Sequence, residues 1–186
     1  MRSTAIRATM AAVILGAEIV LLSGCTGVPT GVTPVSGFDV QRYTGKWYEV
    51  ARLDHSFERG LSRVTAEYTL HSNGTVAVVN RGWDARGQRW KEARGRAVAQ
   101  GEPTVGSLKV AFFGPFYGGY HIIALDKDGY AYSMVCGPTR SYLWILARQP
   151  ALDDAVRANL VTKARDLGFA VDKLIWVDHH EAPAPR

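Results

Sequence analysis

From residue 46 onward the chain repeats short runs in which apolar and polar side chains alternate, and each run ends at a turn. Eight such runs are predicted as β-strands, at 46–54, 62–71, 75–84, 88–100, 106–113, 118–126, 129–136 and 141–148. The segments between them are short and rich in Gly, Asn, Asp and Pro, which is typical of hairpin connections. Eight antiparallel strands joined in this way leave two unpaired edges in an open sheet. Closure into an up-and-down barrel removes both edges.

A helical spacing follows the last of these runs. Apolar residues recur there at every fourth position, at Leu152, Val156, Leu160 and Ala164. Asp153 and Asp154 stand at the start of this pattern and Gly168 at its end, so the sequence predicts one helix over 152–167. A further apolar run predicts a short strand at 173–177. We therefore expect an all-β fold, an eight-stranded antiparallel barrel with one C-terminal helix packed outside it and a short final strand.

The alternation also predicts which side chains face the interior of the barrel. The second strand gives the cleanest example, because polar residues separate Val64, Ala66, Tyr68 and Leu70. The eighth strand is apolar on both faces, as expected if the helix covers its outer side. One face of the fourth strand carries only small residues, Ala93, Gly95, Ala97 and Ala99. Small residues there indicate either unfilled volume inside the barrel or a close approach of backbone.

The first 24 residues have the pattern of an export signal. Arg2 and Arg7 precede an apolar run at 11–22, which is too short to span a membrane. Residues 1–24 are therefore predicted to be a lipoprotein signal peptide that is removed.

Small residues lead from this apolar run to a cysteine. The sequence Leu22-Ser23-Gly24-Cys25 resembles the bacterial lipobox, in which the cysteine is acylated before cleavage. We expect acylated Cys25 to anchor the chain to a membrane, since two or more acyl chains anchor stably. Residues 25–37, rich in Gly, Pro, Thr and Val, are predicted to form a flexible acylated tether. By resemblance to enterobacterial lipoproteins, the absence of Asp at position 26 favours the outer membrane.

Composition and charge restrict the function classes. The chain has 186 residues, of which 47% are hydrophobic, a formal charge of +5 and only two cysteines, which excludes disordered and disulfide-scaffold classes. If Cys25 is acylated, Cys136 has no partner in the chain, and we expect it to pack as a small buried residue. The arginines cluster at positions 81, 86, 89, 94 and 96. They form either a solvated face or a contact surface for anionic lipid headgroups.

Four sequence motifs carry a family resemblance. They are the runs from Gly45 to Arg52, from Phe57 to Leu61, from Phe113 to Tyr120 and from Val135 to Arg148. Together they resemble the bacterial lipocalins, outer-membrane lipoproteins similar to apolipoprotein D. The resemblance implies a lipocalin domain at 38–178, followed by a loose C-terminal tail at 179–186.

The resemblance also implies roles for individual residues. Gly45 and Trp47 belong to the Gly-x-Trp motif, whose tryptophan closes the barrel floor, and Arg148 is expected to lie across the indole ring. The in/out alternation of the family predicts a ligand-binding set, namely Ala66, Tyr68, Val78, Asn80, Val110, Phe112, Tyr120, Ile122, Ser133, Tyr142 and Trp144. Such an interior suits an acyl chain whose polar head sits at the mouth. Glu49 shares the parity of Trp47, and we expect it either to pair with an arginine or to recognise a headgroup.

Motifs of catalysis are missing from the sequence. It contains no Gly-x-Ser-x-Gly, no His-Glu-x-x-His and no Cys-x-x-Cys. His179, His180 and Glu181 could hold a metal, but they lie in the predicted tail, so we expect no metal and no cofactor. A nucleic-acid partner is not expected either, because no basic stripe with interleaved aromatics occurs.

The resemblance then implies a lipid carrier that is not an enzyme. It would be lipid-anchored in the outer membrane, and would store or transport fatty acids such as palmitate, or lysophospholipids, for envelope maintenance under stress. Two alternatives stay open, a lipid-modifying enzyme that uses Glu49 or His55, and a structural envelope lipoprotein with a filled barrel. The sequence leaves the choice between a monomer and a homodimer undecided.

Overall fold

The computed structural model describes residues 26–180, so the predicted export signal and the acylation of Cys25 lie outside the described residues. The strands are β1 (Gly45–Arg52), β2 (Leu61–Leu70), β3 (Val76–Asp84), β4 (Arg89–Ala99), β5 (Ser107–Phe113), β6 (Phe116–Leu125), β7 (Tyr132–Cys136), β8 (Leu143–Ala147) and β9 (Ile175–Trp176). The helices are α1 (Val40–Tyr43), α2 (Asp154–Asp166) and a short 3₁₀ turn, η2 (Val171–Lys173).

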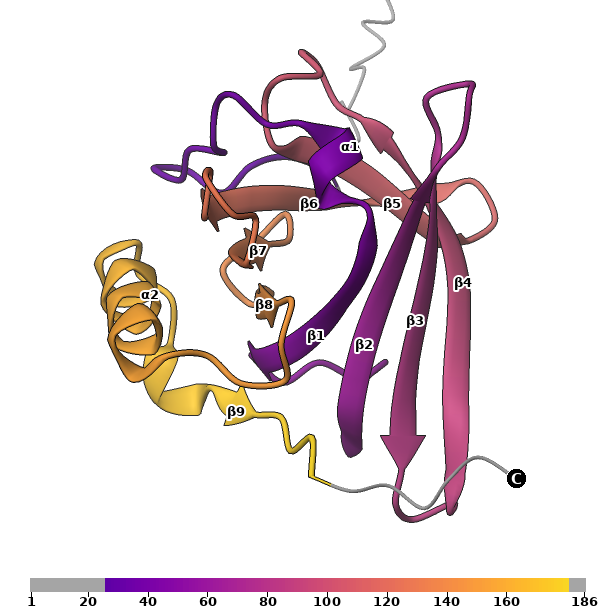
Figure 1. Ribbon diagram of the computed structural model, residues 1–186, viewed down its shortest axis with the longest axis vertical. Coiled ribbons are helices and arrows are strands. Elements are labelled where there is room, and N and C mark those ends of the chain that lie inside the picture. Colours follow the sequence, from indigo (N-terminus) through magenta and orange to yellow (C-terminus); the bar gives the residue numbers. More distant parts are fainter. Residues whose placement is uncertain (1–25, 181–186) are drawn as a thin grey trace, which may run out of the picture.

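The strands form one antiparallel sheet that closes on itself. Its order is β2-β3-β4-β5-β6-β7-β8-β1, and β1 also pairs with β2, which completes the barrel. The short β9 adds to the outside of β1 (Figure 1). The predicted eight-stranded up-and-down barrel, the C-terminal helix and the final strand are all confirmed.

Strand β7 begins three residues later than the sequence suggested. The Asp126 carboxylate accepts a hydrogen bond from the Ala131 amide at 3.1 Å, and Tyr130 adopts a positive φ of 53°. These two features extend the β6–β7 turn to residue 131 and delay the strand.

Apolar side chains form two separate clusters, one on each side of the barrel wall. The outer cluster packs α2 against the sheet, with Leu160 and Ala164 on Met134 and Ile145. Asp153 starts this helix, because its side chain accepts a hydrogen bond from the Ala155 amide at 2.9 Å. The interior cluster lies inside the barrel and includes Trp47, Tyr68, Ile122 and Val135.

Helix α1, which the sequence did not predict, closes one end of the barrel, here called the floor (Figure 1). Asp39 starts it by accepting a hydrogen bond from the Gln41 amide at 2.9 Å. The opposite end, here called the mouth, is bordered by the β1–β2 loop at residues 53–60 and by the β3–β4 hairpin.

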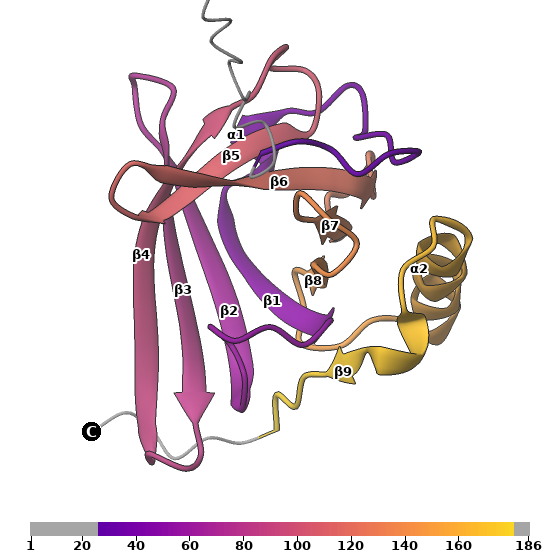
Figure 2. The ribbon, with the colours of Figure 1, turned by 180° about the vertical axis from the view of Figure 1, so that it is seen from behind.

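Residues 26–37 do not form the predicted flexible tether but lie against the barrel. The Val35 amide donates to the Ile122 carbonyl at 2.8 Å, and the Gly106 amide donates to the Val35 carbonyl at 2.8 Å. Val32 is buried against the outer cluster. Backbone hydrogen bonding and this apolar anchor therefore hold the segment along the outside of the barrel (Figure 2).

The predicted loose tail is also attached where it can be described. The His179 ring is 2.8 Å from the Glu49 carbonyl, and Arg63 Nε donates to the His180 carbonyl at 2.7 Å. Residues 181–186 lie outside the described residues.

Candidate functional site

The floor of the barrel is built around Trp47, which is completely buried. Its indole N–H donates to the Tyr43 carbonyl at 2.8 Å, and the Arg148 guanidinium lies over its ring at 3.9 Å. Arg148 also donates to the carbonyls of Lys46 and Arg42, at 2.9 and 2.8 Å. The predicted stacking of Arg148 on Trp47 is therefore present, and the arginine ties β1 to α1 and β8.

Above Trp47, four hydroxyl groups form a continuous chain. Tyr43 Oη lies 3.0 Å from Ser133 Oγ and 2.9 Å from Tyr120 Oη, which in turn lies 2.9 Å from Tyr68 Oη. Burial raises the pKa of Tyr43 to about 12 and holds the pKa values of Tyr68 and Tyr120 well above the usual value. All three phenols are therefore neutral. A linear chain of four hydroxyls has four protons for three bonds, so one O–H of the chain is left to donate to another acceptor.

The middle of the barrel has small residues around one amide. Asn80 pairs in register with Ala66 on β2 and with Ala93 on β4. Its side-chain oxygen is buried and accepts no hydrogen bond among the described residues. A buried acceptor without a partner can accept a hydrogen bond from a ligand group.

Gly95 on β4 is small for a different reason, which is the close approach of a neighbouring strand. A Cβ added to Gly95 would lie 2.7 Å from the Ala111 carbonyl oxygen and 2.8 Å from the Phe112 ring. Of the two explanations offered by the sequence, close approach therefore applies at Gly95. The absence of a side chain at this position lets the Phe112 ring lie against β4.

The mouth half of the barrel contains an ion pair. Arg52 donates from Nη1 to the Glu49 carboxylate at 2.6 Å, and both side chains are almost fully buried. A bulge at Val50 produces this arrangement, since β1 shifts register against β8 between Glu49 and Ala51. Of the two alternatives for Glu49, the pairing with an arginine is present, and the extra residue turns Arg52 inward.

The β1–β2 loop covers the mouth side of this pair. Arg52 Nη2 donates to the carbonyls of Glu58 and Leu61, both at 3.0 Å. The Glu58 carboxylate accepts from the Trp144 indole at 3.2 Å and lies 3.3 Å from the His55 ring. We call Glu49, Arg52, His55, Glu58 and Trp144 the mouth cluster.

The mouth cluster contains more titratable groups than its one guanidinium can balance. Burial first, and then the Glu58 carboxylate, raises the pKa of Glu49 well above its usual value. Burial also raises the pKa of Glu58, whereas burial and Arg52 lower the pKa of His55 to about 4. One guanidinium thus balances one carboxylate, and the second carboxyl is favoured as a neutral acid beside a neutral imidazole.

Most of the predicted ligand-binding residues pack inside the barrel. Eight of the eleven belong to the interior cluster, namely Ala66, Tyr68, Val78, Val110, Phe112, Tyr120, Ile122 and Trp144. Ser133 joins the hydroxyl chain, and Tyr142 lies near Trp144 and His55, with ring centroids 6.1 and 5.9 Å away. Their role in ligand binding stays a prediction. Sequence reasoning missed Tyr43, Arg52 and Glu58.

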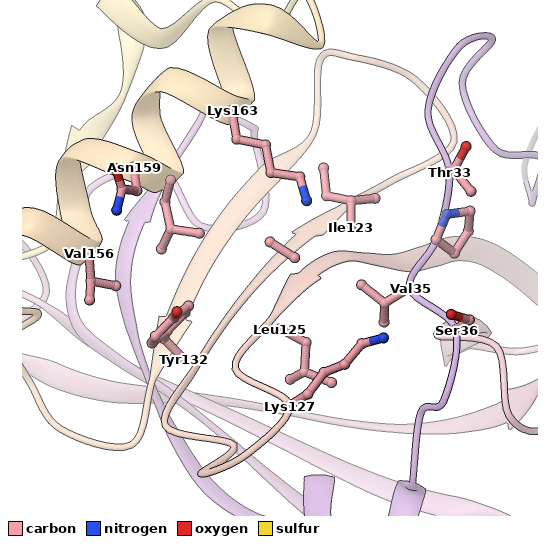
Figure 3. Close-up of a pocket in the computed structure, with 13 residues that line it drawn as sticks. Thr33, Val35, Ser36, Ile123, Leu125, Lys127, Tyr132, Val156, Asn159 and Lys163 are labelled. Atoms are coloured by element: carbon pink, nitrogen blue, oxygen red, sulfur yellow. The ribbon is translucent and has the colours of Figure 1, made fainter.

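A groove of about 510 Å³ lies outside the barrel, between α2 and the segment 33–36 (Figure 3). Lys127 and Lys163 reach across it. The residues that line the groove include Ile123 and Leu160, which also belong to the outer cluster. The groove is therefore the crevice left where the helix and the N-terminal segment meet the sheet.

Two properties of the described residues bear on other functions. Within residues 26–180, no group of three or more His, Cys, Asp or Glu side chains is arranged to hold a metal ion. None of the helices in this range is long and apolar enough to cross a membrane.

Comparisons with known proteins match almost the whole described chain. The family model of the lipocalin-like domain matches residues 38–179. The chain is 48% identical to outer membrane lipoprotein Blc of Vibrio cholerae, covering 90% of this chain and 98% of the relative. It is 51% identical to outer membrane lipoprotein Blc of Escherichia coli K12, covering 80% of this chain and 84% of the relative. Among solved structures, insecticyanin from the tobacco hornworm superposes with a TM-score of 0.68 at 21% identity, covering 84% of this chain and 88% of that chain.

Proposed function

Because the chain belongs to the lipocalin family, we propose that it is a lipid carrier anchored in the outer membrane by acylated Cys25. The cargo is a fatty acid or a lysophospholipid, which the protein stores or transports for envelope maintenance under stress. The location follows the two Blc relatives, which are named outer membrane lipoproteins and are 48% and 51% identical.

The single observation that best supports this cargo is the polar pattern of an otherwise apolar interior. Aliphatic and aromatic side chains from β2 to β8 surround the middle of the barrel. Polar groups with unused hydrogen-bonding capacity stand at separate heights, the Asn80 oxygen in the middle and His55 at the mouth. An acyl chain fits the apolar wall, and its ester, hydroxyl or carboxyl oxygens fit these groups. Binding then consists of reversible burial, with each methylene contributing about 0.8 kcal/mol.

A substitution that fills the interior tests this proposal. Ala93 faces Asn80 inside the barrel, whereas Ala77 on β3 lies on the outer face, opposite Arg96. We expect Ala93→Phe to weaken the affinity for a fluorescent fatty acid at least tenfold. Ala77→Phe should leave this affinity unchanged. The mature chain with Cys25→Ser is the protein to use, and circular dichroism checks that both variants fold. Full-affinity binding by Ala93→Phe would mean that the cargo lies elsewhere, with the groove beside α2 as the next candidate.

One observation favours a second candidate, a lipid-modifying enzyme. His55 and Glu58 lie 3.3 Å apart in a buried site that contains a second carboxyl, Glu49. A Glu49→Gln variant separates the two functions. A carrier retains its ligand with altered affinity, whereas an enzyme loses turnover of a bound lysophospholipid, followed by mass spectrometry of the lipid. The third alternative, a structural lipoprotein with a filled barrel, is tested by measuring thermal stability with and without lipid. Such a protein gains no stability from any lipid.

The oligomeric state belongs to the same set of measurements. The proposal requires only one barrel for each cargo molecule, so it holds for a monomer and for a homodimer. Sedimentation of the mature chain with and without lipid distinguishes them.

A further inference from the structure

The first described residue lies against the outer face of the barrel. The Thr26 carbonyl oxygen accepts a hydrogen bond from the Gln100 side chain at 3.0 Å, and His121 Nε2 lies 3.0 Å from the Gly27 carbonyl. A Cβ added to Gly119 would lie 3.1 Å from the Thr26 oxygen, so the glycine makes room for this contact. Thr26 directly follows Cys25 in the chain. An acyl chain on Cys25 would therefore leave the protein beside β6.

The same face carries positive charge that has no acidic partner among residues 26–180. Arg96 and Lys109 both lie near Tyr117, with their cationic groups 5.6 and 5.1 Å from its ring centroid. Neither side chain forms an ion pair with a described residue, whereas the neighbouring Arg94 is paired with Glu92 at 2.7 Å. Lys109 pairs in register with Gly119, where Thr26 docks, so the unpaired cations and the start of the described chain are adjacent.

Two phenylalanines project at the edge of this face. Phe113 and Phe116 flank the tight β5–β6 turn, and they are 80% and 81% exposed. Folding gains almost nothing from aromatic rings that stay in water, and exposed apolar groups rimmed by charge mark interaction sites. Aromatic rings beside cations suit the bilayer interface, where the rings reach the acyl boundary and the cations meet lipid phosphates.

We propose that the outer face of β4–β6 is a membrane-docking surface, formed by Arg96, Lys109, Tyr117, Phe113 and Phe116, that lays the barrel on its side against anionic lipid headgroups. The acyl anchor then holds the bilayer next to the surface that recognises it. In this orientation α2 points away from the membrane, since it lies on the opposite side of the barrel in both views (Figures 1 and 2).

This inference rests on the proposed acylation of Cys25 but not on the proposed cargo. An intact-mass measurement of the purified protein tests the acylation by itself, and an unacylated Cys25 would overturn the inference. A barrel that binds no lipid would end the carrier proposal and leave the docking surface in place.

Fluorescent labels on opposite faces measure the orientation. Pro115→Cys places a label at the apex of the β5–β6 turn, and Thr162→Cys places one on α2. Cys136 is completely buried, and burial raises the pKa of its thiol to about 12, so it does not compete for the label. The acylated protein is reconstituted into phosphatidylcholine vesicles with or without phosphatidylglycerol, together with a headgroup spin-labelled lipid as quencher. We expect strong quenching at position 115 and little at position 162, and the difference should grow with phosphatidylglycerol.

Charge-removing variants then identify the surface. Each cation near an anionic bilayer is worth about a fivefold change in partitioning. Arg96→Gln with Lys109→Gln should reduce the phosphatidylglycerol-dependent part of the quenching severalfold, and Phe113→Ser with Phe116→Ser should reduce quenching in both vesicle types. Lys163→Gln with Arg165→Gln removes the same charge from α2 and should change nothing.

Two results would overturn the proposal. Equal quenching at both label positions means that no face is preferred. Alternatively, the Arg96 and Lys109 substitutions could leave quenching intact while converting a dimer to a monomer in sedimentation. The face would then be an interface between copies of this chain.

Discussion

The two ends of the barrel interior use polar groups in opposite ways. At the floor, Trp47, Tyr43 and the chain of hydroxyls are neutral and hydrogen-bonded to fixed partners. At the mouth, three titratable side chains, Glu49, Glu58 and His55, surround a single guanidinium, which is paired with Glu49. Both His55 nitrogens lack hydrogen-bond partners among the described residues. The floor therefore contributes stability that changes little with pH. The mouth holds groups whose protonation can change when pH or a ligand changes.

The largest expected effect comes from the floor. Trp47→Ala removes a completely buried indole and its stacking with Arg148, so the free energy of unfolding should fall by about 4–5 kcal/mol. Denaturant unfolding followed by circular dichroism measures this loss. Trp90, which is 37% exposed on β4, is the matched control, and Trp90→Ala should cost less than about 1 kcal/mol. Similar losses for the two variants would contradict a floor that supports the fold.

The second effect breaks the mouth cluster. Arg52→Met leaves two buried carboxyls without a cation, and we expect a loss of about 3–4 kcal/mol in the free energy of unfolding at neutral pH. Adding Glu49→Gln should recover part of this loss, because a neutral amide needs no counterion. Arg59→Met breaks the exposed pair with Asp54 and should cost less than about 1 kcal/mol. A small effect of Arg52→Met would show that the pair is not needed for stability.

The third effect is a pH dependence at the mouth. His55 is held neutral because burial lowers its pKa from 6.5 to about 4, so its contribution to stability is present above pH 6.5 and is lost as pH falls towards 4. His55→Gln should remove about 3 kcal/mol of this acid-induced loss. The raised pKa values of Glu49 and Glu58 act with the opposite sign, since their contribution is lost as pH rises above 4.5. Comparing variant with wild type at each pH isolates the histidine.

His71, which is exposed in the β2–β3 turn, provides the control for this measurement. His71→Gln should leave the pH profile unchanged. If His55→Gln also leaves the profile unchanged, the mouth does not titrate in the way described above.

The smallest expected effect concerns the cation at the floor. Arg148→Met keeps much of the apolar contact with Trp47 but removes the donors to the Lys46 and Arg42 carbonyls, and we expect a loss of about 1–2 kcal/mol. Arg148→Lys retains the charge without the planar fork and should recover less than half of that loss. Thermal unfolding measures both variants, and full recovery by lysine would mean that charge alone matters.

The sequence predicted the two ends unequally, and strand regularity explains the difference. Alternation from Trp47 and Arg148 was sufficient for the walls, where β2 and β8 present Tyr68 and Leu146 to the interior, and for the stacked pair at the floor. At the mouth, the bulge at Val50 changes the alternation, so Arg52 faces inward where simple counting places it outside. A bulge depends on how two strands pair and not on the residue types of one.

Loop and terminal residues of the site were hidden for a related reason. Glu58 comes inward on the β1–β2 loop, and Tyr43 comes inward on the short helix α1, and neither segment has a periodic pattern. The Gly/Pro-rich composition of 25–37 predicted a flexible tether, but Val32 and Val35 dock the described part of this segment on the barrel. Composition alone does not predict that two valines in such a segment dock on the barrel.

The most direct test of the carrier account is native mass spectrometry of the mature chain with Cys25→Ser. The protein is purified without detergent and challenged with fatty acids and lysophospholipids of graded chain length. Burial of each added methylene in the interior predicts adducts that tighten by up to about fourfold per methylene, until the chain fills the barrel. The tightening should be lost in Ala93→Phe. A wild-type chain that stays free of ligand throughout the series, or adducts whose affinity is independent of chain length, would contradict the proposal that this barrel carries lipid.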